Sequence, residues 1–528
     1  MKTKRPSLKS VFVLWIPSIL ITLGILLPLI YLVIRAYDAN IDAWSLLLKS
    51  STIKTLGRTV WLAVWVTLFS ILVALPLAWL TTRSDIPFKR MWAILTPLPL
   101  VIPSYVGAYL LVSMLGPRGM VQQWLEGSLG ISRLPEIYGF PGALYILTVL
   151  SFPFILLSIR SSLQRVDPSL EEASRSLGNN AWQTFWKVIF PQLKPAILTG
   201  SLLVVLYVLR DFGAVSIMRY NTFTRVIYIQ YQSSFDRSTA AILSLVLVSL
   251  TIIILIIKQV SQNRAIIERS DSKNTRPPPI IPLGKWRWPA LIFCSSIVIV
   301  TLIIPGSNLI YWVLRGVQAG EKIGNLWEAT QNSILASGLA AVLILIAAIP
   351  IAIISVRYPN KLSGMIERTT YLSFALPGIV VALALVFFGS NYVSALYQSL
   401  PLLLFAYLVL FLPEAVGSVK TSLQQINPNL EEAARSLGSQ PFRVFQKITF
   451  PLVRPGLVAG FGLVFLTTMK ELSATLILSP IGYKTLAIGV WDAVSEAFFA
   501  RAAAPALLII LISSVPLALM TFRKERKY

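Results

Sequence analysis

One stretch of the chain occurs twice. Residues 167–200 read DPSLEEASRSLGNNAWQTFWKVIFPQLKPAILTG, and residues 427–460 read NPNLEEAARSLGSQPFRVFQKITFPLVRPGLVAG. The two stretches align without a gap at an offset of 260 residues and are identical at 15 of 34 positions. A repeat at this spacing indicates that the 528 residues hold two copies of one structural unit.

The composition indicates the environment of these units. Hydrophobic residues make up 55% of the chain and charged residues 13%, and the mean hydropathy is +0.73. Soluble domains carry about 25% charged residues, and disordered chains have low hydrophobicity, so both classes are excluded. With no histidine and only one cysteine, Cys294, a zinc-type cluster and an internal disulfide are excluded too. We expect no catalytic residue and no stable metal site.

The apolar runs predict an all-α membrane protein. A bilayer core needs about 20 apolar residues per helix. The sequence holds twelve such runs, near 11–34, 59–80, 91–115, 140–159, 196–218, 240–257, 289–314, 332–356, 369–389, 401–419, 456–479 and 502–522. Each repeat lies between the fourth and fifth span of a six-span half. Because six is an even number of crossings, both halves have the same orientation in the membrane.

The basic residues predict which side is cytoplasmic. Of 46 Lys and Arg residues, 31 lie in the N-terminus, the even-numbered loops and the C-terminus, and 13 lie in the odd-numbered loops. This excess predicts that both termini are inside. It also accounts for the net charge of +24, so we expect contact with the lipid bilayer and no nucleic-acid partner.

The pattern of predicted spans and loops divides the chain into successive regions. It predicts an N-terminal helix with the first outside loop (1–58), a first unit (59–257), a cytoplasmic linker (258–288), a seventh helix with an outside loop (289–331), a second unit (332–522) and a basic cytoplasmic tail (523–528). The run Arg276-Pro277-Pro278-Pro279 is typical of a linker.

The repeated loop has the signals of a short capped helix. Asp167 is predicted to be the N-cap, Pro168 the first helical residue and Gly178 the residue after the C-cap. Glu171 and Arg175 are four residues apart and are expected to pair. The same pattern recurs at Asn427, Pro428, Glu431, Arg435 and Gly438. A second amphipathic segment follows and is expected to end at Phe190-Pro191 and Phe450-Pro451. Such a helix either docks on a partner or caps its own bundle, and the matched caps favour docking.

These residues resemble a known motif. Glu171-Glu172-Ala173 with Gly178 and Phe190-Pro191, and Glu431-Glu432-Ala433 with Gly438 and Phe450-Pro451, resemble the EAA loop of ABC importer permeases. The resemblance implies two fused permease units of the type I importer fold, located in a bacterial inner membrane. It also implies that Glu171, Glu172, Ala173, Gly178, Pro191, Glu431, Glu432, Ala433, Gly438 and Pro451 couple this chain to an ATPase.

The resemblance also implies partners. Two coupling helices imply two ABC ATPase subunits, which would carry ATP and Mg, together with an extracytoplasmic solute-binding protein. The chain has no G-x-x-x-x-G-K-[ST] run, so it is expected to bind no cofactor and to be no enzyme itself. The segments 209–231 and 469–491 look like those of ferric iron permeases. Thiamine or an oxyanion such as sulfate remains an alternative solute, and an ion-coupled secondary transporter is an alternative class.

Charged residues inside the predicted spans are functional candidates. Arg210-Asp211 and Lys470-Glu471 occupy equivalent places in the fifth and eleventh spans. We hypothesise that these four residues border the translocation pathway and that Asp211 and Glu471 face each other across the axis. Carboxylate oxygens suit a hard trivalent cation as transient guides. The alternative is that the charges neutralise one another, or that the basic side chains reach to the outer surface.

Two further features lie at membrane depth. Glu414, beside Pro413, is a third acidic candidate, and we expect it to pair with Lys420. Pro97, Pro99 and Pro103 in the third span, and Pro377-Gly378 in the ninth, are predicted to interrupt their helices. A broken helix can line a pathway, because its freed backbone groups need a cavity or a neighbour. A simple packing kink is the alternative.

Overall fold

The computed structural model describes residues 8–38, 44–117, 119–130, 135–233, 238–267, 280–321 and 326–525, and these residues are mainly helical. The first half contains α1 (Leu8–Tyr37), α3 (Ser50–Arg83), α4 (Lys89–Leu95), α5 (Ser104–Leu115), α6 (Met120–Leu129), α7 (Phe140–Leu163), α8 (Pro168–Ser176), α9 (Ala181–Thr184), α10 (Phe190–Arg210), α11 (Gly213–Ile217), α12 (Phe223–Ser233) and α13 (Ser238–Ile267). The second half contains α14 (Arg287–Val298), α15 (Ile304–Gln318), α16 (Leu326–Arg357), α17 (Lys361–Leu372), α18 (Gly378–Tyr392), α19 (Leu400–Gln424), α20 (Pro428–Ser436), α21 (Pro441–Val444), α22 (Phe450–Met469), α23 (Ser473–Leu478), α24 (Leu486–Ser495) and α25 (Phe499–Glu525).

Ten stretches of helix among the described residues are long and apolar enough to cross a bilayer without interruption. Two more pairs of helices meet this test together but are bent at a break. Lys89–Val101 meets Ser104–Gly127 at 94°, and Lys361–Ala375 meets Gly378–Tyr392 at 104°. Counting each bent pair as one span gives the predicted twelve, and the two broken spans are the third and the ninth, where prolines were expected to interrupt the helix.

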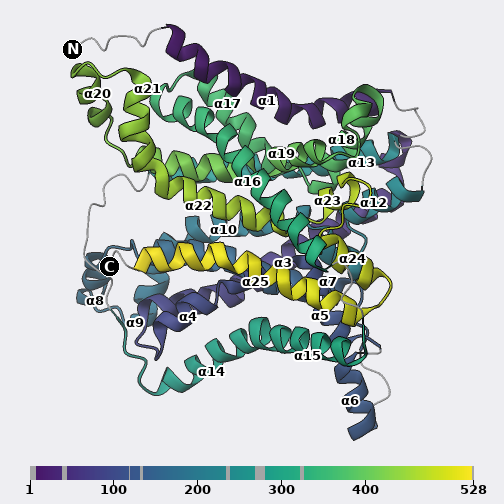
Figure 1. Cartoon of the computed structure of the whole chain (residues 1–528). Helices are drawn as coiled ribbons and strands as arrows, with labels where there is room; N and C mark the ends of the chain where they lie inside the picture. The colour runs from purple at the N-terminus through teal and green to yellow at the C-terminus, as the bar shows by residue number, and fades with distance from the viewer. Residues whose placement is uncertain are drawn as a thin grey trace.

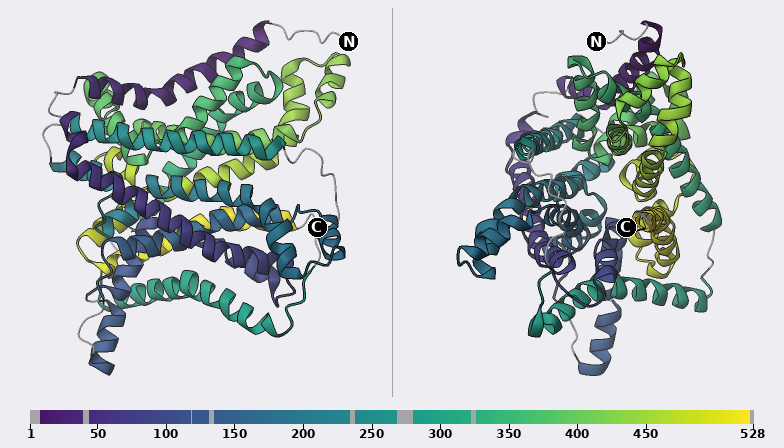
Figure 2. Two further views of the ribbon diagram at one scale, coloured as in Figure 1. Left: turned by 180° about the vertical axis from the view of Figure 1, so that it is seen from behind. Right: turned by 90° about the vertical axis from the view of Figure 1, so that its left-hand side faces the viewer.

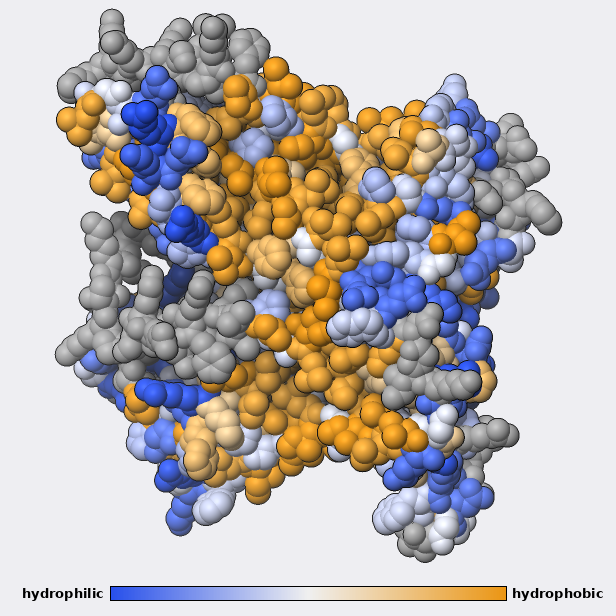
Figure 3. All heavy atoms as spheres, in the orientation of Figure 1, coloured by the Kyte–Doolittle hydropathy of each residue, from blue (hydrophilic) through white to orange (hydrophobic). Residues whose placement is uncertain are grey.

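The spans lie side by side and share two common ends (Figure 1). One end carries α8, α9, α20, α21, the start of α1 and the end of α25, and we call it the repeat end. The opposite end carries α6, α12 and α24. Apolar side chains cover the middle of the molecule, while hydrophilic residues gather at both ends (Figure 3). This distribution is that of a protein whose middle lies in lipid.

The two halves are intertwined. α1 packs on α13 of its own half and also on α16, α17 and α18 of the second half, while α15 packs on α25 and reaches α5 of the first half. Two large hydrophobic clusters form the core, and each draws buried residues from both halves. The view along the spans from the repeat end shows the helices of both halves packed into one bundle (Figure 2, right). Each half therefore buries much of its apolar surface against the other.

The fifth and eleventh spans begin earlier than expected. One continuous helix runs over Ala181–Arg210, so the amphipathic segment does not end at Phe190-Pro191. Proline lacks an N–H and clashes with the carbonyl one α-turn earlier. The chain avoids this clash with a wider turn over Phe185–Ile189, in which the Phe190 N–H bonds to the Phe185 carbonyl. An equivalent wide turn over Phe445–Thr449 precedes Pro451, so this feature is repeated with the motif.

Other boundaries also differ from expectation. α10 and α22 end at Arg210 and Met469, and the short helices α11 and α23 occupy the remainder of the predicted fifth and eleventh spans. α13 continues to Ile267, into the predicted linker, and α6 forms within the predicted outside loop at 116–139. The Arg276-Pro277-Pro278-Pro279 run and the last three residues of the tail lie outside the described residues.

Candidate functional site

The repeated loop folds as its caps predict. The Asp167 carboxylate accepts a hydrogen bond from the Ser169 amide at 2.9 Å, and Pro168 occupies the first position of α8. Gly178 adopts a φ of 85°, which side chains other than glycine rarely tolerate, and its amide bonds to the Arg175 carbonyl at 2.9 Å. The second copy repeats this geometry, with Asn427 as the cap of α20 and Gly438 at a φ of 84°.

Each short helix turns one face outward at the repeat end. On α8 this face carries Glu172 and Ala173, flanked by Leu170 and by Leu177, which is 84% exposed. The equivalent exposed residues beside α20 are Leu430, Glu432, Ala433 and Leu437. Gly178 and Gly438 are exposed as well, whereas the exposed Pro191 and Pro451 lie on the long helices α10 and α22. Two matched surfaces, partly apolar and partly acidic, therefore face the same side of the molecule.

Glu171 and Glu431 point the other way. The Glu171 carboxylate lies 2.8 Å from Nη2 of Arg83, and both side chains are buried. Glu431 pairs with Arg357 in the same manner, at 3.1 Å. The expected pairing with Arg175 and Arg435 is therefore wrong, because those arginines remain on the exposed face and a partner is available inside. An exposed pair contributes little, since water screens it, whereas a buried carboxylate requires a close cation.

Arg83 and Arg357 are functional residues that the sequence did not reveal as partners of Glu171 and Glu431. Arg83 is the last residue of α3 and Arg357 the last residue of α16, so they end the second span of each half. A matched basic residue at the same place in both halves was the available signal. In the sequence, the two arginines are distinguished only by adding to the positive charge of the loops that are predicted to be cytoplasmic.

A second group of functional candidates lies at the far ends of α10 and α22 and on the neighbouring helix α19. It consists of Arg210, Asp211, Glu414, Lys470 and Glu471, and we call it the central charge group. The structure brings charges from the two halves together, because Arg210 and Asp211 both lie within electrostatic range of Glu471, and Arg210 also lies within range of Glu414.

The two acidic residues of the repeated pairs cap short helices. Asp211 accepts hydrogen bonds from the Ala214 and Val215 amides at 3.0 and 3.3 Å, at the start of α11. Glu471 accepts one from the Ala474 amide at 3.0 Å, at the start of α23. Each carboxylate thus has a structural role in its own half beside the role in the pathway that the sequence predicts.

The two broken spans pack directly against these acids. Ser104, the first residue of α5, hydrogen-bonds to Asp211, and the corresponding first residue of α18 is Gly378. A Cβ atom at Gly378 would come within 2.5 Å of the Glu471 carboxylate. The shorter acid therefore faces serine and the longer acid faces glycine, so that the combined volume is similar in both halves.

This size match leads to a prediction about stability. Gly378→Ser places a side chain against Glu471 and should lower the free energy of unfolding by about 1–3 kcal/mol. Adding Glu471→Asp recreates the first-half pair and should restore most of the loss, because the shorter acid makes room. Thermal unfolding of the purified variants measures both effects. Additive losses in the double variant would contradict the size match.

The breaks leave backbone carbonyls that other helices satisfy. The Lys470 ammonium donates to the Leu100 carbonyl at 2.7 Å, and the Thr251 hydroxyl donates to the Ala375 carbonyl at 2.6 Å. Both acceptors lie just before a break. The first contact joins α22 to the third span of the opposite half, so one member of the central charge group holds the two halves together.

Glu414 does not pair with Lys420. Its carboxylate instead accepts a hydrogen bond from the Thr467 hydroxyl at 3.0 Å and lies within electrostatic range of Lys470. Lys420 pairs with Glu367, which also accepts a hydrogen bond from Ser355. The expectation was wrong because Glu367 lies on α17, whose contact with α19 the sequence does not reveal. Glu414 therefore belongs to the central charge group.

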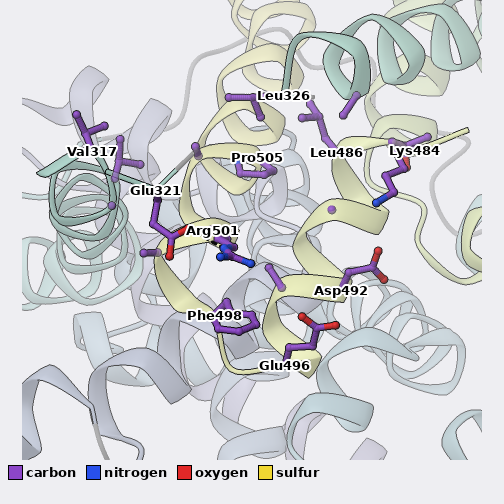
Figure 4. Close-up of a pocket in the computed structure, with 18 residues that line it drawn as sticks. Val317, Glu321, Leu326, Lys484, Leu486, Asp492, Glu496, Phe498, Arg501 and Pro505 are labelled. Atoms are coloured by element: carbon purple, nitrogen blue, oxygen red, sulfur yellow. Dashed lines mark hydrogen bonds and ion pairs between the residues drawn. The ribbon is translucent and has the colours of Figure 1, made fainter. Parts of the chain in front are cut away.

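A cavity of about 430 Å³ lies elsewhere, between α15, α16, α24 and α25. Figure 4 shows Glu321 and Arg501, which form an ion pair at 2.7 Å, together with Asp492 on α24 and Glu496 just after its end. Burial raises the pKa of the Asp492 carboxyl above its ordinary value, and the charge of Lys484 opposes this shift. No member of the central charge group lines this cavity.

Among the described residues, no group of three or more acidic or cysteine side chains could hold a metal ion.

Several known proteins are similar to this chain in sequence. The family described as binding-protein-dependent transport system inner membrane component matches twice, over residues 70–267 and 345–526. The Fe(3+)-transport system permease protein FbpB 2 of Haemophilus influenzae is 37% identical over 96% of this chain and 97% of its own length. The ferric transport system permease protein FbpB of Actinobacillus pleuropneumoniae is 24% identical over 87% of this chain and 69% of its own length.

A shorter relative is informative about the duplication. The molybdenum transport system permease protein ModB of Escherichia coli K12 is 32% identical over 38% of this chain, yet the match spans 90% of its own length. One such protein thus corresponds to less than half of this chain, in agreement with the internal repeat and the two family matches. The chain is a multi-pass inner membrane protein, and it belongs to the family of binding-protein-dependent transport system inner membrane components.

Proposed function

We propose that this chain is the membrane permease of an ATP-driven ABC importer that carries ferric iron into the cytoplasm. The similarity to the Haemophilus influenzae ferric permease carries the proposal, because it extends over nearly the whole of both chains. A solute-binding protein outside the membrane would deliver the iron. The two halves would then alternate between outward and inward access while ATP is hydrolysed on other subunits.

The outward faces of α8 and α20 are the proposed contacts with the ATPase. Two features support this role, namely their matched caps and their common position at the repeat end. Each face would bind one ATPase subunit, so one permease would bind two. Glu172, Ala173, Glu432 and Ala433 are the exposed residues proposed to touch them. The repeat end would therefore be cytoplasmic, as the basic residues predict.

The central charge group is the proposed lining of the pathway. It lies beside the breaks in the third and ninth spans, where irregular backbone can border a passage. Its carboxylates would attract a ferric ion during passage, and Arg210 and Lys470 would prevent tight binding by offsetting their charge. Electrostatic guidance without a stable metal site suits a transporter, which must release its solute.

Two other solutes fit the same architecture. The similarity to a molybdenum transport permease favours an oxyanion as the second candidate, and Arg210 and Lys470 would then be the attracting groups. Thiamine is a further alternative. An ion-coupled secondary transporter would need no ATPase, and the paired exposed helices disfavour it.

Uptake of labelled ferric iron by cells with and without this gene tests the solute. We expect deletion to lower iron uptake at least about tenfold in cells with no other ferric importer, since transport ceases with the permease. Labelled thiamine and molybdate, measured in parallel, should enter both strains equally. Unchanged iron uptake together with reduced uptake of molybdate or thiamine would contradict the ferric proposal and leave the permease architecture intact.

A further inference from the structure

Each exposed helix at the repeat end is tied to its own bundle by an ion pair, which is buried for Arg83–Glu171 and partly buried for Arg357–Glu431. We infer that Arg83–Glu171 and Arg357–Glu431 are latches, which make Glu171 and Glu431 positioning residues that pass the movement of α8 and α20 to the membrane spans. This inference rests on the proposed function. It changes the roles of Glu171 and Glu431, which the motif alone assigns to contact with the ATPase.

The positions of the acids on their helices support this role. Glu171 is buried, whereas its neighbours Glu172 and Ala173 are exposed, so one helix turn presents one acid inward and one outward. α20 has the same division between Glu431 and Glu432. The Glu172 side chain is thus on the surface that a partner at the repeat end would meet, whereas Glu171 is turned inward and pairs with Arg83.

The partner arginines are placed to transmit a displacement. Arg83 is the final residue of α3, which packs along α7 and against α10. Arg357 is the final residue of α16, which packs along α19 and α22. A force on α8 or α20 therefore reaches a long membrane helix through one charge-assisted contact. Separation of the pair would leave two charges in a buried site, so helix and span are expected to move together.

The two latches are not equivalent. Glu431 also accepts a hydrogen bond from the Thr449 hydroxyl at 3.0 Å, and Arg357 also bonds to the Ile426 carbonyl at 3.4 Å. At the place of Thr449 the first half has Ile189, which has no hydroxyl. Nε and Nη1 of the fully buried Arg83 have no hydrogen-bond partner among the described residues. The first latch thus depends on Glu171 alone and should be the more sensitive to neutralisation.

The test measures iron uptake per ATP hydrolysed in vesicles that contain the permease with its ATPase, with the binding protein added. We expect Glu171→Gln to lower this ratio at least about fivefold while the ATPase remains bound, and Glu431→Gln to lower it less, because its arginine keeps another partner. The exchanged pair Arg83→Glu with Glu171→Arg should have a higher ratio than Glu171→Gln, because it restores the ion pair. The conservative variant Arg83→Lys should also have a higher ratio than Glu171→Gln, because it keeps the positive charge. Glu321→Gln breaks the exposed Arg501 pair at the opposite end and should change nothing.

Two results would overturn the latch. One is an unchanged ratio in Glu171→Gln. The other is a loss of ATPase binding in Glu171→Gln that Arg83→Lys does not reproduce and that the exchanged pair does not repair. That second result would make Glu171 a direct contact with the ATPase. Amide hydrogen exchange of the purified permease provides a readout independent of transport. Glu171→Gln should speed exchange over α8, and Glu321→Gln should not. If the unaltered complex imports no iron but exchange still rises in Glu171→Gln, the proposed function fails and the latch remains.

Discussion

Replacing both Ala173 and Ala433 with tryptophan should abolish transport while leaving the membrane bundle folded. Both alanines are exposed on the outward faces of α8 and α20. A large side chain there costs little in the isolated permease, because exposed substitutions usually change stability by less than about 0.5 kcal/mol. At a docked interface the same side chain would separate the two surfaces. If each tryptophan costs about 2 kcal/mol of binding free energy, the two together lower the affinity of the permease for its pair of ATPase subunits roughly a thousandfold.

The measurement is co-purification of the ATPase with the permease, followed by iron uptake. We expect each single variant to weaken binding and the double variant to lose it. Glu126→Trp places the same residue on the exposed surface of α6, at the opposite end, and should leave ATPase binding intact. Normal binding and uptake by the double variant, at normal expression, would show that these faces do not dock.

The double variant Asp211→Asn, Glu471→Gln should fold normally and lose most of its iron uptake. Asn and Gln keep an oxygen that can accept the Ala214 and Ala474 amide hydrogens, so the caps of α11 and α23 survive. The loss in free energy of unfolding should stay within about 1 kcal/mol. Two of the three carboxylates lose their charge, however, and the central charge group keeps Glu414 together with Arg210 and Lys470. A ferric ion would then meet net positive charge, and uptake should fall about tenfold or more.

Two comparisons separate guidance from folding. Asp211→Ala should lower both stability and uptake, because it removes the cap along with the charge. Asp492→Asn removes a carboxylate from the cavity beside α24, away from the central charge group, and should leave uptake unchanged. Normal iron uptake by the Asp211→Asn, Glu471→Gln variant, at normal expression, would remove the proposed pathway role of these acids.

Local signals in the sequence predicted local structure well. Asp167, Pro168 and Gly178 predicted the start and end of α8, because capping depends on residues within a few positions. Pro103 and Pro377 predicted the broken spans, because proline lacks the backbone N–H and so interrupts the helix at its own position. The duplication was visible for the same reason, since it is a property of the chain alone.

Long-range partners could not be predicted in this way. Glu171 was expected to pair four residues along its own helix, yet its partner Arg83 lies at the end of a span almost ninety residues earlier. The size match of Ser104 with Asp211 and of Gly378 with Glu471 also depends on how two distant segments pack. The contacts of α1 and α15 with the opposite half could not be predicted either, because such helices present apolar side chains both to lipid and to neighbouring helices, as the exposed Ile310 and Leu314 of α15 show.

Reconstitution in vesicles tests whether this chain is the permease of an ATP-driven importer. Vesicles containing this chain with its ATPase, with the binding protein and ferric iron on the side opposite the ATPase, should accumulate iron when ATP is supplied. They should not accumulate it with a non-hydrolysable analogue or without the binding protein. Accumulation driven by an ion gradient in vesicles that contain this chain alone would show that the protein is a secondary transporter and not an ABC permease.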